Sequence, residues 1–323
     1  MRRSGRARIL CLAVAGFLAV GLSGCGGEGR SRTFLSLGTG GTGGIYYPLG
    51  GALASLLSTQ DTLRQYTAEV TGGSVENVNR ILTGQIDLGF ALAVTVYEAY
   101  HGSPDFPEPA TELRIVAPLY PNVTHILVPA SSPARTLADL GGLRVSVGSA
   151  GSGTEQISRQ LLEVHGLSYD EVQERFLSFN ESAAALRDGA LDAAIFSVGI
   201  PAAAVLEATT TGSVRLLPVL PDKVEELARR YPYYSAGVIP RGSYPSVEED
   251  IPTVSMMNWL VGPASLPGDV VKRILNILAH DRVSLERVHE MAGSIEVGRL
   301  REAPIPLHDA ARAFLDELVP ETP

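Results

Sequence analysis

The sequence predicts an α/β protein built from two similar lobes. In the first unit, a short apolar strand opens into a glycine-rich turn at residues 38–44, and an Ala- and Leu-rich helix follows at 49–57. The same order returns as a strand at 143–147, a second glycine-rich turn at 148–154 and a helix at 155–165. Because strands and helices alternate in α/β folds, two such units predict two α/β lobes.

A second feature repeats in the same order behind each glycine-rich turn. A helix stops at Gly84 in the first half and at Gly189 in the second. An aspartate, Asp87 or Asp192, follows three residues later and precedes an apolar strand. Two matching elements in the same order indicate a repeated lobe. We expect both aspartates to bond to backbone or cap helices rather than to act as paired acids.

The remaining sequence continues this alternation, which predicts a mostly parallel sheet in each lobe, with ligands at the carboxyl ends of the strands. Further strands are expected at residues 66–70, 86–94, 113–119, 125–129, 214–218 and 253–261. Further helices are expected at residues 75–83, 97–100, 202–209, 222–230, 270–279 and 281–292, with a last helix that ends at 318. Ser74 is the expected N-cap of the helix at 75–83, and residues 235–250 are expected to be loop-rich.

The first glycine-rich turn predicts a site for an anionic or polar small molecule. Glycine lets the backbone approach a ligand closely, and the first N–H groups of the following helix have no partner inside it. Gly38, Gly40 and Gly43 also match the dinucleotide fingerprint, but Asp61, the candidate acidic residue, follows an expected helix end rather than a strand. No lysine follows the glycines, which excludes a Walker-type phosphate loop. A turn without any ligand is the plain alternative.

Residues 1–24 are expected to be a lipoprotein signal peptide. Four arginines and no acidic residue precede a stretch without charge. The stretch ends in Leu-Ser-Gly before Cys25, which resembles a bacterial lipobox. We therefore expect lipid on Cys25, a flexible linker at 25–32 and a protein in the periplasm or on the cell surface, anchored to a membrane through its lipid. An ordinary secretory signal is the alternative.

Charge and cysteine content exclude several classes of protein. Removing residues 1–24 takes away four of 26 basic residues and none of the 35 acidic ones, so the net charge moves from −9 to −13. A net-acidic body argues against a nucleic-acid partner. Cys11 would be discarded and Cys25 modified, which excludes disulfides and cysteine chemistry in the mature protein.

Motifs for catalysis are missing from the sequence. There is no Gly-x-Ser-x-Gly elbow, and His289-Glu290 lacks the second histidine that a zinc site needs at helical spacing. We expect no enzyme activity, no cofactor, no metal and a monomeric state.

Six motifs together resemble the TAXI-type solute-binding proteins of TRAP (tripartite ATP-independent periplasmic) transporters. They are the glycine-rich run at 38–51, Thr-Gly-Gly-Ser-Val-Glu-Asn at 71–77, Leu-Tyr-Pro at 119–121, Gly-Ser-Gly-Thr-Glu at 151–155, Tyr-Pro-Tyr-Tyr at 231–234 and Ile-Pro-Leu-His at 305–308. The resemblance spans residues 33–318 in order. It implies a two-lobed periplasmic-binding-protein fold (Venus-flytrap, type II-like), with lobe I at 33–132 and 239–323 and lobe II at 133–238.

The resemblance also implies a function. It implies capture of a small carboxylate or amino acid, such as glutamate, glutamine or 2-oxoglutarate, between the lobes and delivery to a TRAP membrane permease. The residues expected to bind the ligand are Gly41, Thr42, Gly43, Tyr46, Gly73, Ser74, Ala91, Tyr120, Ser149, Ser152, Gly153, Thr154 and Phe196.

One departure from the family pattern bears on the ligand. Leu92-Ala93-Val94 and Ala202-Ala203-Ala204 stand where more polar residues are expected. A more apolar carboxylate or amino acid is therefore a credible ligand. Two other functions stay open: a periplasmic sensor that hands its ligand to a signalling kinase, and a dinucleotide-dependent enzyme.

Overall fold

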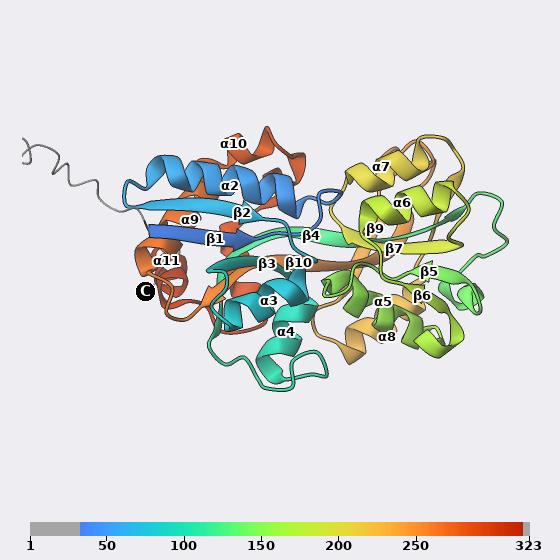
Figure 1. Cartoon of the computed structure of the whole chain (residues 1–323), viewed down its shortest axis with the longest axis horizontal. Helices are drawn as coiled ribbons and strands as arrows, with labels where there is room; N and C mark the ends of the chain where they lie inside the picture. The colour runs from blue at the N-terminus through green and yellow to red at the C-terminus, as the bar shows by residue number, and fades with distance from the viewer. Residues whose placement is uncertain (1–32, 319–323) are drawn as a thin grey trace, which may run out of the picture.

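The computed structural model describes residues 33–318 and has two α/β lobes side by side (Figure 1). The predicted α/β architecture is therefore confirmed. The signal peptide at 1–24, the linker at 25–32 and the modification of Cys25 concern residues outside the described part of the chain. Among residues 33–318, no helix is both long and apolar enough to cross a membrane.

Lobe I, on the left of Figure 1, holds the first glycine-rich turn. Its strands are β1 (Thr33–Gly38), β2 (Arg64–Glu69) and β3 (Leu88–Leu92), which pair in parallel. Its helices are α2 (Tyr46–Gln60), α3 (Ser74–Leu82), α4 (Ala93–His101), α9 (Gly268–His280), α10 (Arg282–Glu286) and α11 (Asp309–Leu318). Two 3-10 helices, η3 (Glu290–Ser294) and η4 (Val297–Glu302), connect α10 to α11.

Lobe II, on the right of Figure 1, holds the second glycine-rich turn. Its strands are β5 (Arg144–Ser146), β6 (Gln173–Arg175), β7 (Ala193–Val198), β8 (Val214–Leu217) and β9 (Ser235–Ile239), and β5 pairs in parallel with β6 and β7. Its helices are α5 (Gly153–Val164), α6 (Phe179–Arg187), α7 (Ala203–Thr209) and α8 (Pro221–Arg230), with 3-10 helices η1 (Leu137–Leu140) and η2 (Tyr169–Glu171).

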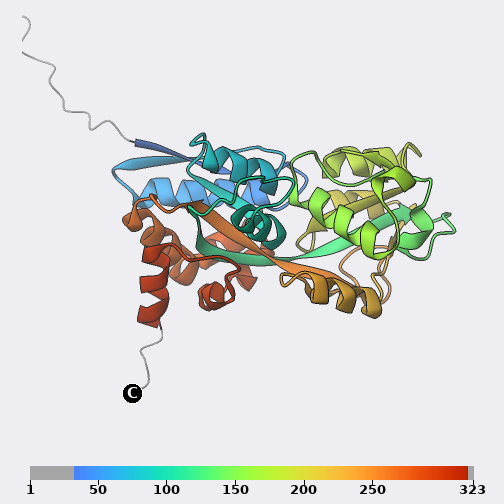
Figure 2. The same cartoon turned by 90° about the horizontal axis from the view of Figure 1, so that it is seen from below.

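Two long antiparallel strands, β4 (Leu113–Pro129) and β10 (Ile251–Pro263), join the lobes. Figure 2 shows them running from one lobe into the other along one side of the molecule. The C-terminal half of β10 pairs with β3 and its N-terminal half pairs with β9. One hydrogen-bonded sheet therefore passes through both lobes. We call the middle of β4 and β10 the hinge; the lobe boundaries at 132/133 and 238/239 stay a prediction.

The repeat of glycine and aspartate has the same structure in both lobes. After α3 the chain passes through Gly84 with a φ of 69°, and after α6 through Gly189 with a φ of 71°, a region that favours glycine. In lobe I, the Asp87 carboxylate accepts a bond from the Ser36 N–H at 2.7 Å. In lobe II, the Asp192 carboxylate accepts one from the Arg144 N–H at 2.9 Å. Ser36 lies on β1 and Arg144 on β5, the strands that pair with β3 and β7, so each aspartate bonds to the backbone of a neighbouring strand in its lobe, which confirms the expected structural role.

The structure corrects four local predictions. The strands expected at 113–119 and 125–129 are one strand, β4, because Pro121 does not interrupt its pairing with β10. The strand expected at 86–94 ends at Leu92, and α4 begins directly after it. Residues 235–250 were expected to be loop-rich, but the first five form strand β9, because their backbone groups pair with β10. Finally, Ser74 is the first residue of α3 rather than its N-cap, which is Gly73.

Candidate functional site

A cavity of about 60 Å³ lies between the lobes. Strands β3 and β7 reach it with their carboxyl ends, where ligands bind in open α/β sheets. Eight of the residues predicted to bind a ligand line this cavity: Gly41, Tyr46, Gly73, Ser74, Tyr120, Ser152, Gly153 and Thr154. The two glycine-rich turns, more than 100 residues apart in sequence, therefore face one space.

Three other predicted residues, Thr42, Gly43 and Ser149, lie at the mouth of the cavity. They line an outer hollow of about 310 Å³ that shares Gly41 and Ser152 with the inner cavity. The inner and outer spaces together form what we call the cleft.

Two predicted residues do not reach the cleft. Ala91 and Phe196 have no exposed surface and belong to the core. Phe196 instead stacks on Phe179 with a ring-centroid distance of 4.7 Å, and Phe179 lines the cavity. Successive side chains of a strand point to opposite faces, so a strand that ends at the cleft presents only some of its residues there.

Four helices begin at residues that line the inner cavity. They are α2 at Tyr46, α3 at Ser74, α5 at Gly153 and α6 at Phe179. The first N–H groups of a helix lack partners inside the helix, and its dipole places partial positive charge at this end. Four such ends around one small cavity favour an anionic group in it.

Hydroxyl groups add further hydrogen-bond donors. The Ser74 Oγ accepts a bond from the Leu92 N–H at 3.1 Å and also contacts the Tyr46 hydroxyl. The Ser152 Oγ accepts one from the Glu155 N–H at 3.2 Å, so the Ser152 hydroxyl hydrogen stays available. Tyr120, Thr154 and Ser197 also line the cavity, and their hydroxyls form no hydrogen bond with another residue of 33–318. Burial raises the pKa of the Tyr120 phenol, which therefore stays protonated.

Two asparagines that were not predicted connect the lobes at the hinge: Asn122, which lines the cavity, and Asn258, which bonds to Asn122. The Asn258 amide donates to the Tyr120 carbonyl and to the Asn122 Oδ1, both at 2.7 Å. The Asn258 Oδ1 accepts a hydrogen bond from the Tyr46 hydroxyl, whose pKa is raised by burial. Asn122 in turn donates to the Ser197 carbonyl at 3.0 Å. The sequence did offer a signal for Asn258, because it is the one polar residue in the apolar run Met-Met-Asn-Trp-Leu-Val, and a polar residue in a buried strand is uncommon.

The cleft is closed by direct contacts between the lobes. At the mouth, the Asn180 side chain of lobe II donates to the Thr42 hydroxyl of lobe I at 3.3 Å. On the α3 side, the Glu76 N–H donates to the Gly151 carbonyl at 3.0 Å. These contacts hold the two lobes together on either side of the inner cavity.

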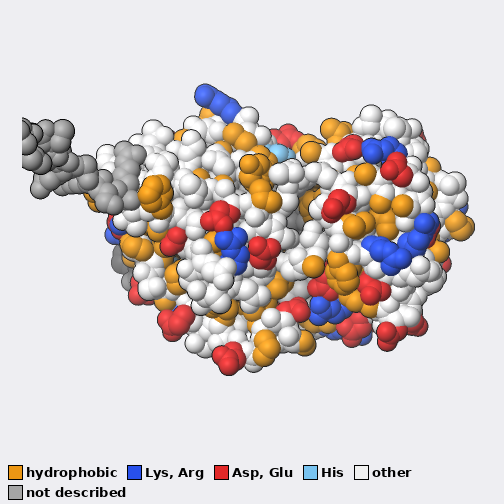
Figure 3. Space-filling model, in the orientation of Figure 1, with side chains coloured by type: hydrophobic (Ala, Val, Ile, Leu, Met, Phe, Trp, Pro, Cys, Tyr) orange, Lys and Arg blue, Asp and Glu red, His pale blue; other side chains and the backbone are white. Residues whose placement is uncertain are grey.

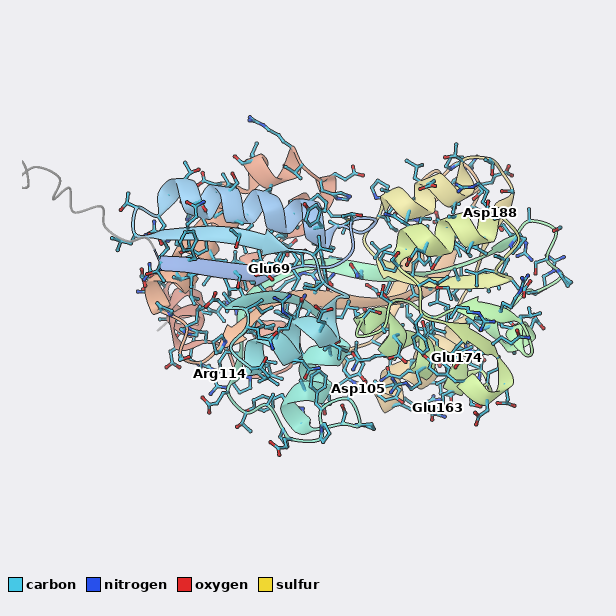
Figure 4. The ribbon with its side chains drawn as sticks, in the orientation of Figure 1. Glu69, Asp105, Arg114, Glu163, Glu174 and Asp188 are labelled. Carbon is cyan, nitrogen blue, oxygen red and sulfur yellow. The ribbon has the colours of Figure 1, made fainter. Side chains whose placement is uncertain are left out.

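A second set of contacts joins α4 to α5. The Gln156 side chain donates to Glu98 at 2.9 Å and to Asp105 at 3.1 Å. Figure 4 shows Asp105 where the loop after α4 meets lobe II. Burial, and then the charge of Asp105, raise the pKa of Glu98.

Charged groups are kept away from the cavity itself. Among residues 33–318, no Lys, Arg, Asp or Glu lines the inner cavity. The same part of the chain holds no group of three or more His, Cys, Asp and Glu side chains placed to bind a metal ion. On the face shown in Figure 3, acidic and basic side chains are interspersed over both lobes.

Comparison with known protein families matches residues 37–318 to the NMT1-like family. The chain belongs to that family. The expected TAXI-type identity is therefore wrong, and the TRAP permease that it implied loses its support. Three of the motifs behind that resemblance, at 38–51, 71–77 and 151–155, are glycine-containing turns that lead into α2, α3 and α5.

Solved structures similar to this NMT1-like chain are two-lobed periplasmic binding proteins, which confirms the predicted fold. PhnD1 from Prochlorococcus marinus in complex with methylphosphonate has a TM-score of 0.55 and 13% identity, over 88% of this chain and 97% of that one. The periplasmic binding protein BugD has a TM-score of 0.55 and 14% identity, over 90% and 95%. A putative L-cystine ABC transporter protein from Listeria monocytogenes has a TM-score of 0.51 and 13% identity, over 82% and 98%.

Proposed function

We propose that this chain is an extracytoplasmic solute-binding protein that captures a small carboxylate between its two lobes and delivers it to a membrane transporter. The observation that carries the proposal is the cavity between the lobes, where four helix N-termini and several free hydroxyls meet without any charged side chain. The fold supports a binding role rather than an enzymatic one, since similar structures are described as binding or transport proteins.

Energy estimates support a carboxylate bound without a buried cation. A helix N-terminus contributes about 0.3–2 kcal/mol toward an anion, and a hydrogen bond to a charged group about 1.5–3 kcal/mol. Micromolar affinity requires about 8 kcal/mol. Three or four such contacts from Ser74, Ser152, Thr154 and the helix N–H groups reach that value.

The lining favours a carboxylate over an amino acid. An α-ammonium group needs acceptors, and the inner cavity has no carboxylate to supply them. The volume of about 60 Å³ corresponds to about two waters at about 30 Å³ each, which suits a carboxylate head group. The rest of the ligand extends toward the mouth past Leu92, Phe179 and Val198, which are apolar. An apolar distal end is consistent with this lining.

A thermal-shift screen with matched pairs of ligands tests the proposal. Each pair contains a 2-oxo acid and the amino acid of the same skeleton, for example pyruvate with alanine and 2-oxoglutarate with glutamate. Ligands that bind only the folded state raise the melting temperature. We expect the oxo acid of at least one pair to raise it more than its partner. No shift with any carboxylate would contradict the proposed function, and a larger shift with the amino acids would contradict the ligand class.

A further inference from the structure

A second cavity, of about 360 Å³, lies against the hinge strand β10, and we call it the hinge cavity. Successive side chains along a strand point to opposite faces of the sheet. Asn258 bonds to Tyr46 and Tyr120 at the cleft, whereas Met257 and Trp259 line the hinge cavity. Strand β4 reaches both cavities, because Tyr120 and Asn122 line the inner cavity and Pro121, between them, lines the hinge cavity.

Aromatic rings form much of the wall of the hinge cavity. Tyr97 comes from α4 in lobe I, and Tyr233 and Tyr234 precede β9 in lobe II. The rings of Tyr97 and Tyr233 have centroids 5.5 Å apart, and those of Tyr233 and Tyr234 are 5.3 Å apart. Its volume lies in the range of small-molecule sites, which are mostly apolar with a few placed polar groups.

Arg299, a hydrogen-bond donor of the hinge cavity, lacks an oxygen acceptor, and so does the buried Nε1 of Trp259. Arg299, on η4, donates to the Met257 sulfur at 3.2 Å, and a thioether is a weak acceptor. The carboxylates of Glu296 and Glu302 each lie 3.7 Å from the guanidinium, beyond hydrogen-bond distance. The Nε1 of Trp259, a side chain that is 1% exposed, has no partner among residues 33–318.

We propose that the hinge cavity is a second binding site, for a small aromatic molecule that carries one carboxylate. The ring packs against Tyr97, Tyr233 and the indole, as aromatic pairs prefer at these separations. The carboxylate accepts two parallel hydrogen bonds from Arg299, a geometry that outcompetes the two distant glutamates. Because both lobes contribute to the wall, occupancy of this site is linked to the angle between the lobes. The proposal stands apart from the function proposed for the cleft.

The test uses Trp259, the only tryptophan of the chain, as a reporter inside the cavity. The full-length protein is titrated with para-nitrobenzoate, a ring that quenches indole fluorescence, and with para-nitrobenzamide, its neutral counterpart. We expect saturable quenching by the benzoate and at least about tenfold weaker binding of the amide. This comparison needs no variant, so it does not depend on the folding of one.

Two variants then assign the site. Arg299→Gln removes the proposed partner of the carboxylate, and Arg301→Gln changes an exposed arginine on the same 3-10 helix. We expect about tenfold weaker benzoate binding in Arg299→Gln and no change in Arg301→Gln, with the amide unaffected in both. Quenching that rises linearly without saturation, equal binding of benzoate and amide, or equal behaviour of the two variants overturns the proposal.

Discussion

Gly153, the first residue of α5 in lobe II, lies against Ser74, the first residue of α3 in lobe I. A Cβ atom added to Gly153 would lie 2.9 Å from the Ser74 Oγ and 2.8 Å from the Leu92 Cδ1. Contacts below 3.0 Å force a neighbour to move. The two helix starts can approach this closely only because residue 153 has no side chain, so glycine here permits closure of the cleft.

Gly153→Ala should therefore weaken ligand binding without unfolding the protein. The added methyl group hinders closure, and overpacking of a tight contact costs about 1–3 kcal/mol, or roughly tenfold or more in affinity. Gly51→Ala is the matched control, since nothing lies within 4 Å of a Cβ built at that helical position. Calorimetric titration with the tightest carboxylate of the screen measures the difference. Equal affinities in the two variants would show that closure does not depend on Gly153.

Tyr120→Phe should reduce affinity and leave stability unchanged. The Tyr120 hydroxyl lines the cavity and bonds to no other described residue, so its loss removes a donor for the ligand only. A hydrogen bond to a charged group is worth about 1.5–3 kcal/mol, which corresponds to a loss of at least about tenfold in affinity. Tyr46→Phe is the contrasting variant, because it removes the donor to Asn258 and should lower the free energy of unfolding by about 1–3 kcal/mol.

Asn258→Ala should be among the most destabilising polar substitutions in the cleft. It leaves the Tyr46 hydroxyl, the Tyr120 carbonyl and the Asn122 amide oxygen without their partner. Unpaired buried groups cost about 1–3 kcal/mol each, so we expect a loss of at least about 2 kcal/mol in urea denaturation. Asn180→Ala, at the mouth, should change the free energy of unfolding by less than about 0.5 kcal/mol. A small effect at Asn258 would mean that water replaces the lost amide.

Stability should fall as the pH drops from about 6.5 to about 4, and His125 should cause part of that fall. Burial lowers the pKa of His125 to about 4, and its Nε2 lies 3.0 Å from the Tyr244 hydroxyl. In the unfolded chain the imidazole takes up a proton near pH 6.5, whereas in the folded protein it stays neutral down to about pH 4. Below about pH 6.5 proton binding therefore stabilises the unfolded state, and the free energy of unfolding falls. The full loss is about 3 kcal/mol at pH 4. His125→Asn should flatten the dependence of unfolding free energy on pH, and an unchanged slope would exclude His125 as its source.

Sequence reasoning found the glycine-rich turns of the cleft because their signals are local. Gly41, Ser74 and Gly153 stand at strand-to-helix junctions, where glycine and small hydroxyl residues mark a helix start. The repeated spacing of Gly and Asp also predicted two similar lobes, and in the structure each aspartate bonds to a strand of its own lobe.

The floor of the cleft could not be predicted in the same way. Asn258 bonds to Tyr46 and Asn122, which lie 212 and 136 positions away along the chain, and only the pairing of β10 with β4 brings them together. The orientation of strand residues could not be predicted either, and the structure places Phe196 and Ala91 in the core beside the cavity.

Hydrogen–deuterium exchange measured by mass spectrometry, with and without the tightest carboxylate of the screen, tests the binding of the ligand between the lobes most directly. The account predicts slower exchange in both glycine-rich turns, residues 38–44 and 148–154, at the same ligand concentration. Slower exchange in only one turn, or at the hinge cavity alone, would contradict it.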